Sequence, residues 1–323
     1  MLDTVAQRNT LLSSIEKARN SAVIAYMLHD NAVIADDALP QIYDKLQVIQ
    51  KRERIDLLLY TRTGVTEVCW RLLNLLREYC DHLGVIVATR VQGAGSLLAL
   101  GADQIVMGPL SELGGLEGIR KHPMLPRDEL DQPLPISLGE IKTLANYIRG
   151  SESSGASVPD LSWLVQYIHP LALANLLQAD TLGRDVSRRA LRMHMHPDDE
   201  KRVEGLVDLF NGGFHSPMYT AGRTELLEAG LPVTGAEDGL WNDIWNLVQL
   251  YQQALYVDRP DPATPGAFFR YVCIIESPGR TTGLRQSFTQ SDGQERVLQI
   301  RWETAIKGPG PGPSFGPGGV SNN

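Results

Sequence analysis

The sequence has few cysteines, no excess of basic charge and no long uninterrupted apolar run. Its three cysteines cannot all pair and none lies in a CxxC arrangement, so neither a disulfide framework nor a structural zinc site is expected. Thirty Lys and Arg against 38 Asp and Glu give a net charge of -8, which argues against a protein that grips nucleic-acid backbones. The most apolar stretch, residues 84–107, is interrupted by Arg90 and Asp103 and is no membrane span.

The first twenty residues are polar and mixed in charge, without the apolar segment of a secretory signal. We therefore expect a cytoplasmic protein with reduced thiols, no nucleic-acid partner and no membrane span. Apolar residues make up 43% of the 323-residue chain, enough for a large core.

Short apolar runs alternate with amphipathic stretches between residues 21 and 109. Strands are expected at 21–28, 54–61, 84–91 and 104–108, with helical spacing of apolar residues between them. These apolar runs are too continuous for strands that expose one face to solvent, so both faces of the strands are expected to be buried. The pattern predicts an α/β fold whose core is a parallel sheet covered by helices.

The pattern changes after residue 109. Helices are expected over the ranges 136–149, 161–195, 198–210, 221–229 and 240–256. Four arginines in one of these helices are interpreted as a solvated face or a subunit contact; they are Arg184, Arg188, Arg189 and Arg192. Beyond residue 266, short strands separated by turn residues predict a small antiparallel β appendage, and the Gly/Pro-rich end predicts a disordered tail. The expected division is therefore 1–257, 267–305 and 308–323.

Two glycine-bearing turns follow buried strands, at residues 61–65 and 91–96. Ligands of open parallel sheets bind at the carboxyl ends of the strands. A tight turn that leads into a helix there offers backbone N–H groups to a developing oxyanion. The second turn lacks the full dinucleotide-binding and P-loop motifs, so we expect no nucleotide cofactor.

The segment GAGSLLALGADQIVMGPLSELGGLEG (93–118) resembles the core of the Clp protease/crotonase superfold, and most closely that of the serine dehydrogenase proteinase family. RIDLLLYTRTG (54–64) resembles the family's strand and oxyanion loop. YIHPLALANL (167–176) and GGFHSPMYTAGRTELLEAGLPV (212–233) resemble two further family segments. The resemblance spans residues 21–255 in the right order. It implies a Clp-like fold, a serine peptidase activity and a homo-oligomer.

The sequence departs from the family at the nucleophile. The family serine stands ten residues before the aspartate of Ala-Ala-Asp, and ten residues before Asp103 is Gly93. The resemblance places the oxyanion hole at the backbone N–H groups of Gly64 and Ala94. Ser96 lies one helical turn beyond the expected position, which is far in catalytic terms. It is interpreted first as a helix N-cap and second as a displaced nucleophile.

His215 matches a histidine of the family pattern and is the candidate base, although a loop histidine is more often a surface residue. His194 and His196 lie near two aspartates, but no third ligand stands at a suitable spacing, so no metal is expected.

Three functions stay open from the sequence. The favoured one is a protein with the Clp fold but without a nucleophile, which binds a peptide or protein or acts in assembly. The first alternative is an active serine peptidase that uses Ser96 and His215. The second is a crotonase-type acyl-CoA enzyme, because crotonases carry glycines where Clp proteases carry serine.

Overall fold

The computed structural model describes residues 2–116, 122–129, 131–132, 134, 136–153, 164–216, 218–291 and 294–306. The expected tail at 308–323 lies outside these residues. The described strands form one sheet in the order β11-β10-β9-β1-β2-β3-β4-β7, with three short strands at its margins. The strands are β1 (Ala22–Leu28), β2 (Arg52–Thr61), β3 (Cys80–Val91), β4 (Gln104–Met107), β5 (Glu112–Gly114), β6 (Thr220–Gly222), β7 (Val233–Gly235), β8 (Arg259–Pro260), β9 (Phe268–Ser277), β10 (Arg280–Ser291) and β11 (Gln294–Ile306).

The predicted α/β fold with a parallel core is confirmed. Strands β1, β2, β3, β4 and β7 run parallel, and all four predicted strands are present. Strands β9, β10 and β11 are antiparallel, as the C-terminal pattern predicts. They continue the main sheet, because β9 pairs with β1 from Ala25 opposite Glu276 to Leu28 opposite Cys273. The division of the chain at residues 257 and 267 stays a prediction.

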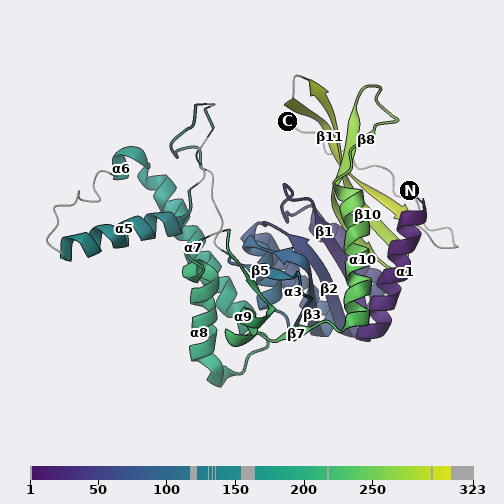
Figure 1. Ribbon diagram of the computed structural model, residues 1–323, viewed down its shortest axis with the longest axis horizontal. Helices are drawn as coiled ribbons and strands as arrows, with labels where there is room; N and C mark the ends of the chain where they lie inside the picture. The colour runs from purple at the N-terminus through teal and green to yellow at the C-terminus, as the bar shows by residue number, and fades with distance from the viewer. Residues whose placement is uncertain are drawn as a thin grey trace.

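Helices cover both faces of the sheet (Figure 1). They are α1 (Leu2–Arg19), α2 (Ala38–Ile49), α3 (Thr66–Tyr79), α4 (Ser96–Leu100), α5 (Leu138–Ser153), α6 (Leu164–Tyr167), α7 (Pro170–Leu191), α8 (Glu200–Asp208), α9 (Arg223–Glu228) and α10 (Asp238–Leu255), with the short turns η1 (Gly93–Gly95), η3 (Pro197–Asp199) and η4 (Leu209–Gly213). Alternate residues of β1 belong to two cores. Ile24 and Tyr26 pack in the core that includes α2, α3, α4, α7 and α8, whereas Val23 and Met27 pack in the core with α1 and α10. Burial of both faces explains the continuous apolar runs.

The four arginines of α7 pair with acidic residues within the chain. Arg184 pairs with Asp208 at 2.6 Å, and Arg188 and Arg192 pair with Glu204 and Glu200, all three acids lying on α8. Arg189 pairs with Asp185 on its own helix. The interpretation as a free solvated face or a subunit contact is therefore incomplete, because most of this face holds α8 against α7.

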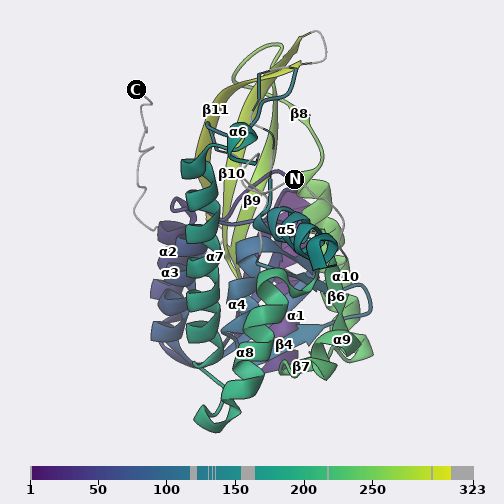
Figure 2. The same ribbon diagram turned by 90° about the vertical axis from the view of Figure 1, so that its left-hand side faces the viewer.

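Helices α5 and α6 and the start of α7 form an arm that projects from the side of the body (Figures 1 and 2). A small apolar cluster of Leu125, Ile168 and Ala172 belongs to this arm. The arm leaves large side chains exposed, among them Tyr147, Tyr167 and Leu171.

Candidate functional site

The loop after β2 and the turn after β3 lie against each other at the carboxyl edge of the parallel strands. A Cβ built on Gly64 would lie 3.5 Å from the amide nitrogen of Gly95, and one built on Gly93 would lie 3.1 Å from Cα of Thr63. The Gly93 amide donates a hydrogen bond of 2.9 Å to the carbonyl of Gly115. The structure thus brings together the two turns that the sequence predicts as one site.

Gly93 occupies a left-handed backbone conformation and a tight space, both of which favour glycine. Its φ of 62° is left-handed, a region that costs a residue with a Cβ on the order of 1 kcal/mol or more. A Cβ there would also stand 3.2 Å from the Arg62 carbonyl oxygen, closer than ordinary van der Waals contact. Since both close neighbours of that Cβ are backbone atoms, they cannot rotate away. Position 93, where sequence register predicts the family nucleophile, therefore has little room for a serine side chain.

Two backbone amides at this edge are available as donors. Among the described hydrogen bonds, none uses the N–H of Gly64 or of Ala94. Gly64 is half-buried and Ala94 is buried. Their role as an oxyanion hole stays a prediction.

Ser96 is completely buried, and its hydroxyl is already used. Its Oγ donates to the carbonyl of Gly114 at 2.7 Å and lies 3.4 Å from the carbonyl of Val91. Helix α4 begins at Ser96, and its N-cap is Gly95 without a side-chain hydrogen bond. The interpretation of Ser96 as an N-cap was therefore wrong, because the hydroxyl fastens β5 to the end of β3 instead.

His215 lies in the turn after η4, exposed and with a left-handed φ of 59°. None of its described contacts reaches Ser96, so the structure does not bring the two residues of the peptidase hypothesis together. His215 instead lines a hollow of about 730 Å³ beside α5, together with Glu140, Lys142 and Tyr147. A hollow of this size falls within the range of ligand sites in proteins.

Cys69 lies next to the loop that contains Gly64, but its thiol cannot act as a nucleophile in place of the family serine. Its Sγ would be 2.8 Å from a Cβ at Gly64, so the thiol stands beside the site. Burial raises the pKa of Cys69 to about 12, and the thiolate is the reactive form of cysteine. At neutral pH this side chain is therefore an unreactive thiol.

A polar cluster that the sequence did not predict borders the same edge. Asp30 accepts hydrogen bonds from the hydroxyls of Tyr60, at 2.6 Å, and Tyr256, at 2.7 Å, and pairs with Arg62 at 3.1 Å. Although burial opposes it, the two tyrosine hydroxyls and Arg62 hold the pKa of Asp30 below its usual value. Burial lowers the pKa of the adjacent His29, whose ring lies 4.5 Å from that of Tyr256. His29 and Asp30 directly follow β1, the one signal in the sequence that could have located them.

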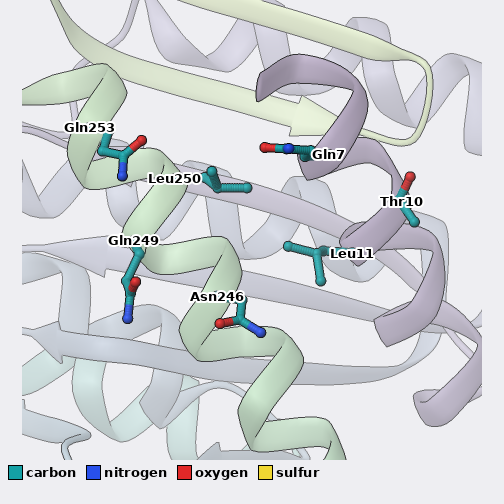
Figure 3. A pocket seen from close by; sticks show the side chains of 7 residues that line it. All are labelled: Gln7, Thr10, Leu11, Asn246, Gln249, Leu250 and Gln253. Atoms are coloured by element: carbon teal, nitrogen blue, oxygen red, sulfur yellow. The ribbon is translucent and has the colours of Figure 1, made fainter. Parts of the chain in front are cut away.

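Other hollows lie away from this edge. One of about 450 Å³ runs between α1 and α10, where Gln7, Thr10 and Leu11 face Asn246, Gln249, Leu250 and Gln253 (Figure 3). It contains amides and leucines but no acid, base or nucleophile. In the described part of the chain, no group of three or more His, Cys, Asp or Glu side chains could hold a metal ion, and no helix is long and apolar enough to cross a membrane.

Comparisons with known proteins give distant similarities. No family model matches the chain. An uncharacterized protein of Methanocaldococcus jannaschii is 22% identical over 257 residues, which cover 76% of this chain and 79% of that protein. A variant of the membrane-bound stomatin-specific protease 1510-N has 12% identity and a TM-score of 0.40, over 74% of this chain and 86% of its own. A second variant of that protease, in complex with a substrate peptide, has 14% identity and a TM-score of 0.36, over 68% and 76%. TM-scores of this size describe a partial likeness and say nothing about activity.

Proposed function

We propose that this chain is a serine-proteinase-like protein that no longer hydrolyses and that binds a peptide or another protein instead. The observation that carries the proposal is Gly93. Sequence register puts the family nucleophile at this position, and a Cβ there would stand 3.1 Å from Thr63 Cα and 3.2 Å from the Arg62 carbonyl oxygen, which is a tight fit. Backbone N–H groups can still form an oxyanion hole when glycine replaces the nucleophilic serine, but the backbone cannot supply a nucleophile.

The neighbouring side chains support a site without hydrolytic activity. A serine nucleophile needs a base within hydrogen-bond reach, whereas the buried Ser96 hydroxyl donates its one proton to the backbone carbonyl of Gly114. The neutral thiol of Cys69 is no substitute. His215 lines the hollow beside α5.

The binding surface that fits this proposal best is the hollow beside α5. It measures about 730 Å³ and combines a cation, a carboxylate and an exposed aromatic ring in Lys142, Glu140 and Tyr147. Lys142 also pairs with Asp180 at 3.2 Å, and Glu140 accepts a hydrogen bond from the Ser137 N–H at 2.7 Å. Peptides offer backbone amides and side chains of both kinds to such a surface. Aromatic residues are enriched among those that carry binding energy.

Fluorophosphonate labelling tests the loss of hydrolysis. We expect no more labelling of the native protein than of the Ser96→Ala and His215→Ala variants, because no activated hydroxyl is present. An active serine peptidase processed in parallel controls the probe, and circular dichroism controls the fold. Stoichiometric labelling of the native protein that disappears in both variants would show a working Ser96–His215 pair and overturn the proposal.

Binding is tested with fluorescein-labelled, reduced and carboxymethylated α-lactalbumin, a polypeptide that stays unfolded. Fluorescence anisotropy should show saturable binding to the native protein without cleavage of the probe. Tyr147→Asp should weaken it at least about tenfold, because a charge replaces an exposed ring of the hollow. Tyr43→Asp is the matched control, since Tyr43 is also an exposed tyrosine on a helix, α2, outside the hollow. Absence of binding, or equal loss in both variants, would contradict the proposed surface.

A further inference from the structure

A cavity of about 200 Å³ lies between the start of α1, the end of α10 and the strands β9, β10 and β11. Figure 1 shows the two helices side by side on this face of the sheet. Val5 of α1, Ala254 of α10 and Ile274 of β9 give the cavity an apolar wall, and charged and hydroxyl-bearing side chains complete it. None of the lining residues belongs to the glycine turns or to the hollow beside α5.

Arg8 brings a buried cation to this cavity. Its side chain is only 4% exposed, and its Nε donates to Glu276 at 2.7 Å. The Tyr251 hydroxyl is a second hydrogen-bond partner. A guanidinium carries several N–H donors on three nitrogens. Within the described part of the chain these two residues are its hydrogen-bond partners, so further N–H groups of Arg8 are left for a molecule in the cavity.

Arg259 lines the cavity from β8, just past the end of α10. Its Nη1 donates to the carbonyl of Ala254 at 3.2 Å, and its Nη2 donates to that of Gln253 at 3.0 Å. These bonds place the cation at the carboxyl end of the helix, where the helix dipole favours it. None of the described hydrogen bonds of Arg259 uses Nε or reaches a carboxylate. Its positive charge therefore has no acidic partner among the described residues.

The carboxylate in the described lining, Glu303, already has its own partners. It accepts hydrogen bonds from Arg285 at 3.1 Å, from Arg301 at 2.9 Å and from the Tyr271 hydroxyl at 3.2 Å. Although burial opposes it, these bonds hold the pKa of Glu303 below its usual value, so the group is ionised at neutral pH. The lining thus offers donors for one anionic group, while the charge of Glu303 would repel a second.

The size of the cavity limits the molecule that it can hold. Sites for drug-sized ligands measure about 300–1,000 Å³, so this cavity suits a smaller compound. A cavity of about 150 Å³ holds benzene, and in proportion this one holds a molecule of about eight non-hydrogen atoms. The apolar wall of Val5, Ala254 and Ile274 would surround a short hydrocarbon group of such a molecule.

We propose that this cavity binds a small monocarboxylate, whose carboxylate group is held by Arg8 and Arg259 and whose hydrocarbon tail packs against Val5, Ala254 and Ile274. Arginine suits this task because its planar guanidinium matches the two oxygens of a carboxylate, and hydrogen bonds between ionised groups are the strong ones. The bound molecule would connect α1 and α10 to the C-terminal strands.

Ligand-observed NMR tests the proposal with matched probes. Isovalerate and L-valine share one branched skeleton and differ in the ammonium group, and 3-methylbutan-1-ol has that skeleton without the carboxylate. At least one of the two carboxylates should give saturable saturation-transfer signals with the native protein, and the alcohol should bind at least about tenfold more weakly. Tighter binding of L-valine would identify an amino acid as the ligand class, and tighter binding of isovalerate a simple carboxylic acid. Absence of saturable binding by both, or equal binding of the alcohol, would overturn the proposal.

Two variants test where the carboxylate binds. Ala254→Phe fills the cavity from α10, and Arg259→Met removes one cation, so each should weaken binding at least about tenfold. Gln252→Phe and Arg296→Met are the matched controls, because Gln252 is an exposed residue of the same helix and Arg296 an exposed arginine of β11, both outside the lining. Circular dichroism checks the fold of each variant. Affinity that is unchanged in either cavity variant, or reduced equally in its control, would also overturn the proposal.

Discussion

Replacing Asp56 with alanine is expected to lower the free energy of unfolding by about 3–5 kcal/mol, the usual cost of removing one partner from a buried ion pair. Asp56 lies in β2 and is completely buried. Its carboxylate accepts hydrogen bonds from Arg19 at 2.9 Å, at the end of α1, and from Ser21 at 2.7 Å, just before β1. The substitution would leave the Arg19 guanidinium largely buried without a carboxylate, so the connection between α1 and the sheet would weaken. Urea unfolding followed by circular dichroism measures the change.

Asp36→Ala is the control for that measurement. Asp36 also pairs with an arginine, Arg71, but both side chains are exposed, and exposed pairs contribute about 0–1 kcal/mol. A loss below about 1 kcal/mol for Asp56→Ala, equal to the control, would show that the buried pair carries little stability. Replacing Gly84 with a residue that has a Cβ should also destabilise the fold, because that Cβ would lie 1.7 Å from an oxygen of the Asp56 carboxylate.

Glu276→Leu is expected to cost a similar amount, about 3–5 kcal/mol, because it also removes one side of a buried network. Glu276 in β9 is completely buried. It accepts hydrogen bonds from Arg8 of α1 at 2.7 Å, from the Tyr251 hydroxyl of α10 at 2.8 Å and from Thr281 of β10 at 2.5 Å. Leucine would leave the Arg8 charge and two hydroxyls without an acceptor. The free energy of unfolding in urea is again the readout.

The double variant Arg8→Met/Glu276→Leu separates the buried charge from the packing. Removing both charges often restores stability that removal of one destroys, so the double variant should be at least about 1.5 kcal/mol more stable than Glu276→Leu alone. Arg8 also stands over the Tyr251 ring at 5.2 Å, and methionine retains part of that contact. Strict additivity of the two single changes would show that Arg8 and Glu276 are not coupled.

The parallel core could be predicted because burial on both faces leaves a strong signal. The runs at 21–28, 54–61 and 84–91 are apolar without alternation, and they became β1, β2 and β3. Helix α1 could not be predicted in the same way. It is polar over most of its surface, and only two of its described apolar side chains, Leu12 and Ile15, are fully buried. Leu12 and Ile15 share one helical face with the buried Arg8, and this charge breaks the apolar stripe. The position of α1 depends on contacts with α10 and on Arg8 and Arg19, whose partners lie far away in the sequence.

Part of the candidate site depends on sequence register. Counting back from Asp103 leads to Gly93, whose place as the nucleophile position stays a prediction, and the left-handed φ of Gly93 is one that favours glycine. The role of Ser96 was not predictable, because its acceptor, the Gly114 carbonyl, is 18 residues away in a strand too short to show in the sequence. The Asp30 cluster draws on Tyr60 and Tyr256, and only folding brings these segments together.

The position of β1 between β2 and β9 has a consequence for synthesis of the protein on the ribosome. Its parallel neighbour β2 follows within a few dozen residues, but β9 begins 240 residues after β1 ends, at Phe268 after Leu28. At about 5–20 residues per second, that interval lasts roughly 12–48 s. Throughout that interval, the side of β1 that later pairs with β9 has no partner strand. This side lies at the centre of the finished sheet. A nascent chain halted before residue 268 should therefore recruit chaperones or aggregate, and release of the C-terminal strands should end that vulnerability.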